Sequence, residues 1–182
     1  GSAGSYHMEY GFSCMGYEIA GALGIKMAEP NRDVICFTGD GTYMMANSEL
    51  ATASMMKADF TIIITDNRGF GCINRLQMGT GGAEFNNLFE HTYMGENLSI
   101  DFVSHSASMG ATSIKASSVK ELEEALTKRH SISGPYVIVI DTDPYPSTHF
   151  GGTWWDVAVP EISERNQVNE KYVDYVKNKA KR

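Results

Sequence analysis

The stretch Val34-Ile35-Cys36-Phe37-Thr38-Gly39-Asp40-Gly41-Thr42 decides the fold. Its first five residues are mainly apolar and β-branched, which is typical of a short strand buried in a sheet. Gly39, Asp40 and Gly41 then interrupt the run, and Asp-Gly is a common turn dipeptide. Because a helical pattern follows from about residue 47, we expect a strand that ends at a turn and leads into a helix.

The rest of the chain alternates between strand and helix patterns in the same way. Residues 60–65 form a β-branched run that ends at Asp66-Asn67. Strands that alternate with helices predict an α/β fold with a doubly wound, mainly parallel sheet flanked by helices. The expected helices cover residues 15–28, 47–57, 102–109 and 119–130, and the expected strands cover residues 34–38, 60–65, 112–115 and 136–140.

The bulk composition fits one globular domain. The chain has 182 residues, 42% of them hydrophobic and 20% charged, and a formal net charge of −7. This negative charge argues against nucleic acid as a partner, and no apolar run approaches the ~18–20 residues of a membrane span. The cysteines are odd in number and widely spaced, which predicts reduced thiols and a cytoplasmic protein rather than a disulfide framework or a zinc site. They are Cys14, Cys36 and Cys72.

Two segments lie outside the alternating pattern. The opening Gly1-Ser2-Ala3-Gly4-Ser5 has the composition of an added flexible linker. We therefore assign residues 6–182 to the domain, with a tail helix from about residue 164. Residues 79–98 open with Gly79-Thr80-Gly81-Gly82 and are long for a plain connection, which predicts a lid that orders when a ligand binds.

Asp40 and Asn67 each follow a predicted strand, at the sheet edge where ligands of α/β proteins bind. The glycines beside Asp40 let backbone N–H groups face an anion. The Asp40 carboxylate would repel a phosphate, however, unless a cation lies between them. Mg²⁺ prefers oxygen ligands such as a carboxylate and an amide oxygen, and it shares them with phosphate. The alternative is that both motifs are ordinary turns.

Together the two motifs resemble the signature of thiamin-diphosphate-dependent enzymes. Gly39-Asp40-Gly41, then 25 residues from 42 to 66, then Asn67 match the family pattern of Gly-Asp-Gly, about two dozen residues and Asn. The resemblance implies that Asp40, the Asn67 side chain and the Gly69 carbonyl bind Mg²⁺ beside bound thiamin diphosphate. It also implies that Gly41 and Thr42 contact the diphosphate and that Gly39 belongs to the cofactor site.

The pair Met15-Gly16 is a third element of the resemblance. In acetolactate-synthase-like members, a bulky apolar residue about 25 residues before the motif's Asp supports the bent cofactor. Met15 precedes Asp40 by 40 − 15 = 25 residues. The resemblance then implies that the Ser13 carbonyl accepts a hydrogen bond from the aminopyrimidine. The alternative is a methionine of the core.

Within this family, the chain resembles the trihydroxycyclohexane-1,2-dione hydrolases of myo-inositol catabolism. The resemblance spans about residues 6–163 and is carried by residues 9–18, 69–74 and 154–157. It implies a small-molecule substrate, a ring dione, that hydrolytic C–C cleavage opens to 5-deoxyglucuronate. Asn74 and Gln77 are candidate substrate contacts; the alternative is that they lie on a solvated helix face. Trp154 and Trp155 could line the pocket; the alternative is packing in the core or at an interface. His91 and His149 could also contact the substrate; the alternative is that they are ordinary surface histidines.

The activating glutamate of the family has no counterpart in the chain. In the family it hydrogen-bonds the aminopyrimidine from a separate pyrimidine-binding domain, and Glu9, Glu18 and Glu49 do not match that role. We therefore expect an incomplete enzyme. Its partner would be a pyrimidine-binding domain of the same or a neighbouring subunit, in a homo-oligomer when full length.

Three other interpretations stay open at this point. One is a domain of an acetolactate-synthase-like carboligase or decarboxylase, which shares the cofactor motifs. Another is a non-catalytic nucleotide-binding or interaction module, although no Gly-x-Gly-x-x-Gly follows the first strand. The third is a naturally split enzyme whose pyrimidine-binding half is another polypeptide.

Overall fold

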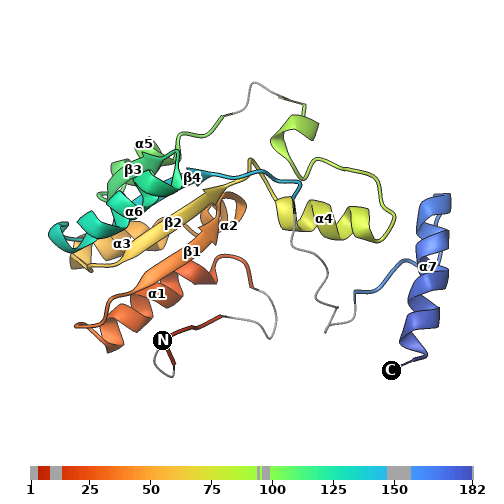
Figure 1. The fold of residues 1–182 in the computed structure, drawn as a ribbon, viewed down its shortest axis with the longest axis horizontal. Coiled ribbons are helices and arrows are strands. Elements are labelled where there is room, and N and C mark those ends of the chain that lie inside the picture. Colours follow the sequence, from red (N-terminus) through yellow and green to blue (C-terminus); the bar gives the residue numbers. More distant parts are fainter. Residues whose placement is uncertain (1–3, 9–13, 94, 96–98, 147–156, 182) are drawn as a thin grey trace. The chain divides into compact units, whose positions relative to one another are not determined.

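The structure is a computed structural model in which the chain divides into two compact units. The first unit consists of Gly1–Asn67 and Ile100–Thr142, and the second of Arg68–Ser99 and Asp143–Arg182. The first unit carries the sheet, and the second carries helices α4 and α7 (Figure 1). The residues that the structure describes are 4–8, 14–93, 95, 99–146 and 157–181.

A four-stranded sheet forms the centre of the first unit. Its strand order is β1-β2-β4-β3, and each neighbouring pair is parallel. Strand β2 is buried over its first four residues, as expected for a central strand with both faces covered. The predicted parallel α/β sheet is thus confirmed. The strands are β1 (Ile35–Gly39), β2 (Thr61–Asp66), β3 (Thr112–Ala116) and β4 (Tyr136–Asp141).

Helices cover both faces of this sheet, so the unit is doubly wound. On one face, α1, α3 and α5 pack against Cys36, Ile62 and Val137. On the other face, α6 packs through Ala125 against Ile138. The helices of this unit are α1 (Tyr17–Ala28), α2 (Asp40–Met45), α3 (Ser48–Met56), α5 (Phe102–Ser108), α6 (Val119–Lys128) and the 3-10 turn η3 (Arg129–Ser131).

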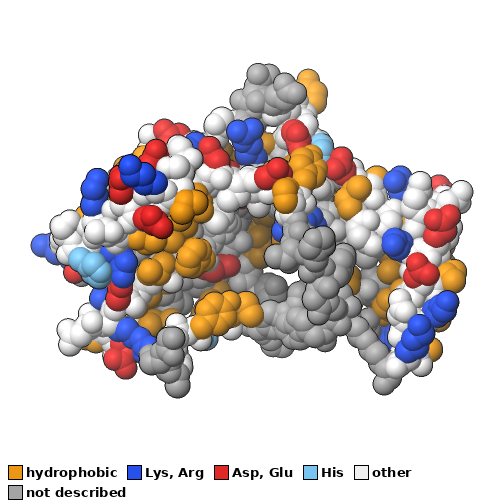
Figure 2. Space-filling model, in the orientation of Figure 1, with side chains coloured by type: hydrophobic (Ala, Val, Ile, Leu, Met, Phe, Trp, Pro, Cys, Tyr) orange, Lys and Arg blue, Asp and Glu red, His pale blue; other side chains and the backbone are white. Residues whose placement is uncertain are grey.

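One face of the edge strand β1 is open to solvent. Side chains alternate along a strand, so Cys36 points into the core while Ile35 and Phe37 point outward. Phe37 is 66% exposed. Figure 2 shows hydrophobic side chains of this kind in patches on the surface of the first unit. At β1, the buried side chains therefore face only the α1 side of the sheet.

The start of α2 differs from the sequence-based expectation. The sequence predicts a turn at Gly39-Asp40-Gly41 and a helix only from about residue 47. In the structure Gly39 is extended, with φ −78° and ψ 157°, and α2 begins directly at Asp40. A carboxylate in the first turn suits the helix dipole. The six residues of α2 are too few to display a helical period, which is why the sequence pattern did not reveal it.

The second unit is built from short elements joined by loops. Arg165 Nε donates to the Gly81 carbonyl at 2.8 Å and so holds the start of α7 to the turn at Gly81. A side chain at Gly81, where φ is 85°, would collide with the Gln167 carbonyl. Across the described part of both units, no helix is long and apolar enough to cross a membrane. The elements are α4 (Gly71–Gly79), η1 (Phe89–His91) and α7 (Asn166–Lys179).

The buried face of the sheet should dominate the stability of the first unit. Ile62 is fully buried, whereas Ile35 on the neighbouring strand is 39% exposed. Ile62→Ala should lower the free energy of unfolding by about 2–5 kcal/mol, because it leaves a cavity in the core. The matched variant Ile35→Ala should lower it by less than about 1 kcal/mol. Urea denaturation of both variants measures the difference, and equal losses would contradict this description of the core.

Candidate functional site

The two residues whose side chains are predicted to hold Mg²⁺ meet at the carboxyl end of the β1–β2 pair. The parallel register sets Gly39 opposite Thr65, so Asp40 and Asp66 leave the sheet at the same level. Asp40 is 1% exposed. The backbone N–H of Asn67 donates to Asp40 Oδ1, with 3.4 Å between the nitrogen and the oxygen. Parallel pairing therefore brings together two residues that lie 27 positions apart in the chain.

The chemistry of this pair fits a hard divalent cation. A buried carboxylate needs a counter-charge or hydrogen bonds, and Mg²⁺ takes carboxylate, amide and carbonyl oxygens in octahedral geometry. Over the described ranges, no three His, Cys, Asp or Glu side chains gather as metal ligands. The predicted set contains only one such side chain, Asp40, so amide, carbonyl and phosphate oxygens would have to complete it.

The third predicted ligand, Gly69, belongs to the second unit and lies in a tightly constrained loop. Arg68 has φ 63° and Gly69 has φ 144°, both in the region that favours glycine. Gly69 forms an antiparallel bridge with Leu88, and a Cβ at Gly69 would collide with the Asn87 carbonyl. Phe70 N donates to that carbonyl at 2.7 Å. Only glycine fits this position, and its role as a ligand stays a prediction.

Part of the segment predicted as a lid contacts this loop. Leu88 is buried, and Phe89 N donates to the Arg68 carbonyl at 2.9 Å. Residues 87–89 therefore pack beside residues 68–70, and the lid over residues 79–98 stays a prediction. Glycines at the start of the segment suggest flexibility, but the backbone groups of the 68–70 loop need hydrogen-bond partners.

Met15 lies in the turn before α1, close to the end of α2. A Cβ placed on Gly16, where φ is 97°, would lie 2.9 Å from the Ala46 Cβ, so the two segments approach as only glycine allows. Met15 is 39% exposed and is one of the residues that line a groove of about 780 Å³ beside β1. This exposure argues against the alternative of a core methionine. Ser13 lies outside the described residues.

A buried tyrosine that the sequence analysis missed anchors α2. Tyr43 follows the predicted diphosphate residues Gly41 and Thr42, and its hydroxyl lies 2.9 Å from His105 Nδ1 on α5. Its ring packs edge-on against Phe102, with 5.6 Å between the centroids. Burial raises the pKa of Tyr43, so the phenol stays neutral. A tyrosine two residues after Gly-Asp-Gly looks like an ordinary core residue, and nothing in the sequence indicates a contact with His105.

The two substrate candidates on α4 are placed differently from each other. Gln77 donates to the Ala83 carbonyl and accepts from Asn87 Nδ2 at 2.7 Å, so both ends of its amide are engaged inside the unit. Asn74 is 3% exposed, which rules out the solvated helix face. Its Oδ1 is buried and has no hydrogen-bond partner within the described chain. Trp154 and Trp155 lie outside the described residues.

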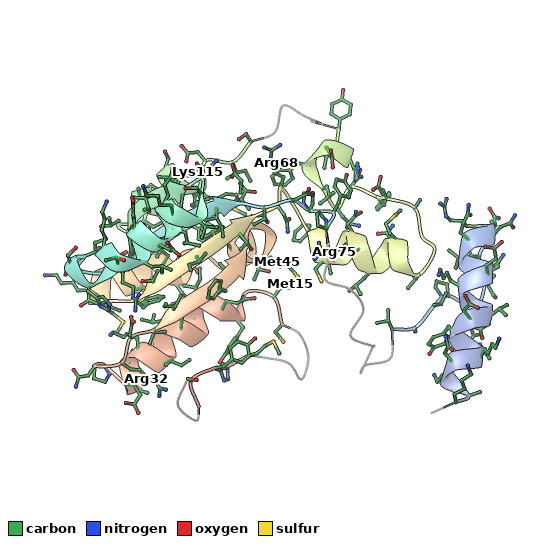
Figure 3. The ribbon with its side chains drawn as sticks, in the orientation of Figure 1. Met15, Arg32, Met45, Arg68, Arg75 and Lys115 are labelled. Atoms are coloured by element: carbon green, nitrogen blue, oxygen red, sulfur yellow. The ribbon has the colours of Figure 1, made fainter. Side chains whose placement is uncertain are left out.

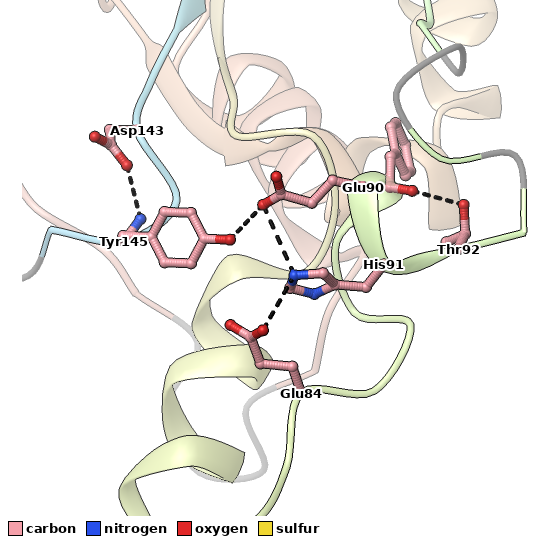
Figure 4. Close-up of polar contacts among 7 residues, drawn as sticks. Glu84, Glu90, His91, Thr92, Asp143 and Tyr145 are labelled. Carbon is pink, nitrogen blue, oxygen red and sulfur yellow. Dashed lines mark hydrogen bonds and ion pairs between the residues drawn. The ribbon is translucent and has the colours of Figure 1, made fainter.

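His91 belongs to a polar cluster in the second unit (Figure 4). Its Nε2 lies 3.2 Å from Glu84 Oε2 and 3.9 Å from Glu90 Oε1. The Tyr145 hydroxyl donates to Glu90, and this bond, with the surrounding negative charge, raises the pKa of Tyr145 to about 12. The His91 side chain is 21% exposed and lies beside two glutamates, so both the substrate contact and the ordinary surface histidine stay open. His149 lies outside the described residues.

Known proteins resemble the chain in sequence and in fold. The family model "Thiamine pyrophosphate enzyme, C-terminal TPP binding domain" matches residues 2–140. A Bacillus cereus protein named 3D-(3,5/4)-trihydroxycyclohexane-1,2-dione hydrolase 2 is 42% identical over 187 residues, which is 97% of this chain and 28% of that protein. A Bacillus anthracis protein named 3D-(3,5/4)-trihydroxycyclohexane-1,2-dione hydrolase is 40% identical over 96% of the chain and 28% of its own length.

A solved structure supports the fold. The thiamine diphosphate-dependent 4-hydroxybenzoylformate decarboxylase of Rhodococcus jostii RHA1 superimposes with a TM-score of 0.63 at 23% identity. The match covers 71% of this chain and 23% of that one. At this identity the likeness concerns the fold alone. The chain spans 28% of the length of the two curated relatives named above.

Tyr145 should stay protonated well above the ordinary tyrosine pKa of about 10. A raised pKa in the folded state adds stability that is fully present below the unfolded pKa and is lost as pH rises toward about 12. In NMR of ¹³Cζ-labelled tyrosine at a pH of roughly 11, Tyr145 should be mostly neutral, and Glu90→Gln should lower its pKa and raise its ionised fraction. Glu84→Gln is the matched control and should have a smaller effect, because Glu84 contributes charge without the hydrogen bond. Ionisation at the ordinary pKa in the unaltered chain would contradict the Tyr145–Glu90 contact.

Proposed function

The chain belongs to the family of C-terminal TPP-binding domains of thiamine pyrophosphate enzymes, and we propose that this domain anchors the diphosphate of thiamin diphosphate through Mg²⁺. Thiamine pyrophosphate and thiamin diphosphate are the same compound. The observation that carries the proposal is the buried Asp40 carboxylate in contact with Asn67 at the ends of neighbouring parallel strands. Ligands of parallel sheets bind at that edge.

Each residue at this edge then has a distinct task. Asp40 and the amide oxygen of Asn67 hold Mg²⁺, and the Gly69 carbonyl is the third ligand by the family motif. Gly41 and Thr42 follow Asp40 in the first turn of α2 and contact the diphosphate, and Gly39, just before Asp40, belongs to the cofactor site. When bound, thiamin diphosphate supplies a thiazolium carbanion as the nucleophile.

Two residues before α1 are proposed to shape the rest of the cofactor site. Met15 presents a half-exposed thioether beside the end of α2 and would support the bent cofactor. A flexible, polarizable side chain suits such a contact. The Ser13 carbonyl is proposed, from the motif alone, to accept a hydrogen bond from the aminopyrimidine.

We propose that the whole protein hydrolyses a C–C bond of trihydroxycyclohexane-1,2-dione. The relatives with that name are 42% and 40% identical to this chain, which favours the dione over the 2-oxo acids of acetolactate-synthase-like enzymes. The buried, unpartnered Asn74 Oδ1 supports a role for Asn74 in accepting a hydrogen bond from a substrate hydroxyl. Gln77, Trp154 and Trp155 stay candidates, although Gln77 would first have to exchange its internal bonds.

The remaining parts of the enzyme are proposed to come from elsewhere in the assembly. A pyrimidine-binding domain, of the same or a neighbouring subunit, would supply the activating glutamate. A homo-oligomer follows if neighbouring subunits complete each other's sites. We also propose a cytoplasmic location, which the odd number and wide spacing of the cysteines Cys14, Cys36 and Cys72 support.

Removing the charge of Asp40 should abolish Mg²⁺-dependent cofactor binding. Asp40→Asn keeps the shape of the side chain but loses the negative charge that attracts the metal. Affinity for thiamin diphosphate in the presence of Mg²⁺, measured by isothermal titration calorimetry, should fall at least about 100-fold. Asp40→Ala should behave in the same way if the fold survives.

The matched control is Asp33→Asn. Asp33 lies just before β1, at its opposite end, where it accepts a hydrogen bond from Arg129. This variant should bind the cofactor like the unaltered chain. Thermal unfolding curves of all variants check that each is folded. An unchanged affinity of Asp40→Asn for thiamin diphosphate would contradict the assignment of Asp40 as a metal ligand.

The isolated chain should catalyse no C–C cleavage, even with saturating thiamin diphosphate and Mg²⁺. Asp40 and Asn67 can anchor the diphosphate end and Met15 can support the bend, but none of them can activate the aminopyrimidine. The pyrimidine end would also stay open to water, which weakens electrostatic stabilisation of the transition state. Adding the separately produced pyrimidine-binding domain should restore turnover of the dione. Turnover by residues 6–182 alone, at the rate of the complete enzyme, would overturn this division of labour.

A further inference from the structure

A second methionine, Met45, stands near Met15 at the end of α2 (Figure 3). The Cβ position of Gly16, the residue after Met15, lies 3.9 Å from the Met45 Cβ. Met45 is 55% exposed. Exposed methionines are common on protein surfaces and need no explanation singly. What distinguishes Met45 is its position relative to the predicted diphosphate residues.

The fixed orientation of α2 decides which way Met45 faces. Tyr43 is buried and is held to His105 on α5, so its side of α2 faces the core. Successive helical residues turn by about 100°, which places Met45 roughly opposite Tyr43. Residues three and four apart share a helix face, so Met45 shares its face with Gly41 and Thr42.

Along this face of α2, a polar surface is therefore followed by an apolar one. The polar end is the first turn of α2, where Gly41 and Thr42 are proposed to meet the diphosphate. The apolar end follows one turn later, where Met45 on α2 stands near Met15 on the adjoining turn. A ligand with an anionic end and an aromatic ring fits this order, because thioethers make favourable contacts with aromatic rings.

We propose that Met45 is a second apolar support for the ring portion of thiamin diphosphate, beside Met15. The inference rests on the proposed function, because it takes the diphosphate to be held at Asp40. Met45 would cover part of the ring and keep water from it, which strengthens electrostatic interactions there. Met45 would therefore contribute to the affinity for the ring portion and contribute nothing to the affinity for the diphosphate.

The test compares two probes on the same chain by isothermal titration calorimetry with Mg²⁺: thiamin diphosphate and inorganic pyrophosphate, which lacks the ring portion. Met45→Ala should weaken binding of thiamin diphosphate about fivefold or more and leave pyrophosphate binding unchanged. Met45→Leu keeps the apolar bulk and should restore the affinity, whereas Met45→Gln should not. The matched control is Met27→Ala, at the far end of α1, where a methionine is 60% exposed and both affinities should stay the same.

The possible outcomes separate this inference from the proposed function. If the unaltered chain binds neither probe, the proposed function fails and the role of Met45 fails with it. If the unaltered chain binds both probes and Met45→Ala matches it, only the role of Met45 is overturned. A loss of both affinities in Met45→Ala would mean damage to α2 and would also overturn a specific contact with the ring.

Discussion

The parallel pairing of β1 with β2 is the constraint on which the site depends. Parallel neighbours require a crossover, and here α2 and α3 supply it between Gly39 and Thr61. Because β2 is buried on both faces, its register against β1 is strongly specified. A slip by one residue would turn the side chains of β2 to the wrong faces and move Asn67 along the sheet relative to Asp40. The hydrophobic core thus fixes the distance between two polar groups that lie outside it.

The residues around the site are held by backbone geometry as much as by side chains. Gly16 permits the close approach of the Met15 turn to α2, and Gly69 permits the bridge to Leu88. Tyr43 then fixes the rotation of α2 through His105. Sites built on rigid elements keep their geometry better than sites on free loops. The first unit holds Asp40 in this way, and residues 87–89 give the 68–70 loop of the second unit a comparable support.

The sequence predicted the features that rest on local patterns and missed those that rest on distant contacts. The strands were predictable because β-branched runs such as residues 60–65 mark buried strands, and the strand ends located Asp40 and Asn67. Helix α2 was missed because a helix of six residues that starts at Gly-Asp-Gly displays no period. The bridge between Gly69 and Leu88 could not be predicted, because neither segment carries a sequence pattern that indicates the other as its partner. For the same reason the sequence did not show that the Gln77 amide is hydrogen-bonded to Ala83 and Asn87.

An acidic group at a diphosphate site makes two binding events depend on each other. The chain carries a net charge of −7, and Asp40 adds a carboxylate at the point where an anionic ligand is proposed to sit. Without a cation, like charges repel, so the diphosphate gains little there. With Mg²⁺ between them, the same carboxylate becomes attractive. Since coupling between two ligands is reciprocal, the diphosphate must raise the affinity for Mg²⁺ by the same factor by which Mg²⁺ raises the affinity for the diphosphate. A lysine in place of Asp40 would bind phosphate directly and would remove this interdependence, which is the physical reason for a carboxylate at a strand end that serves an anion.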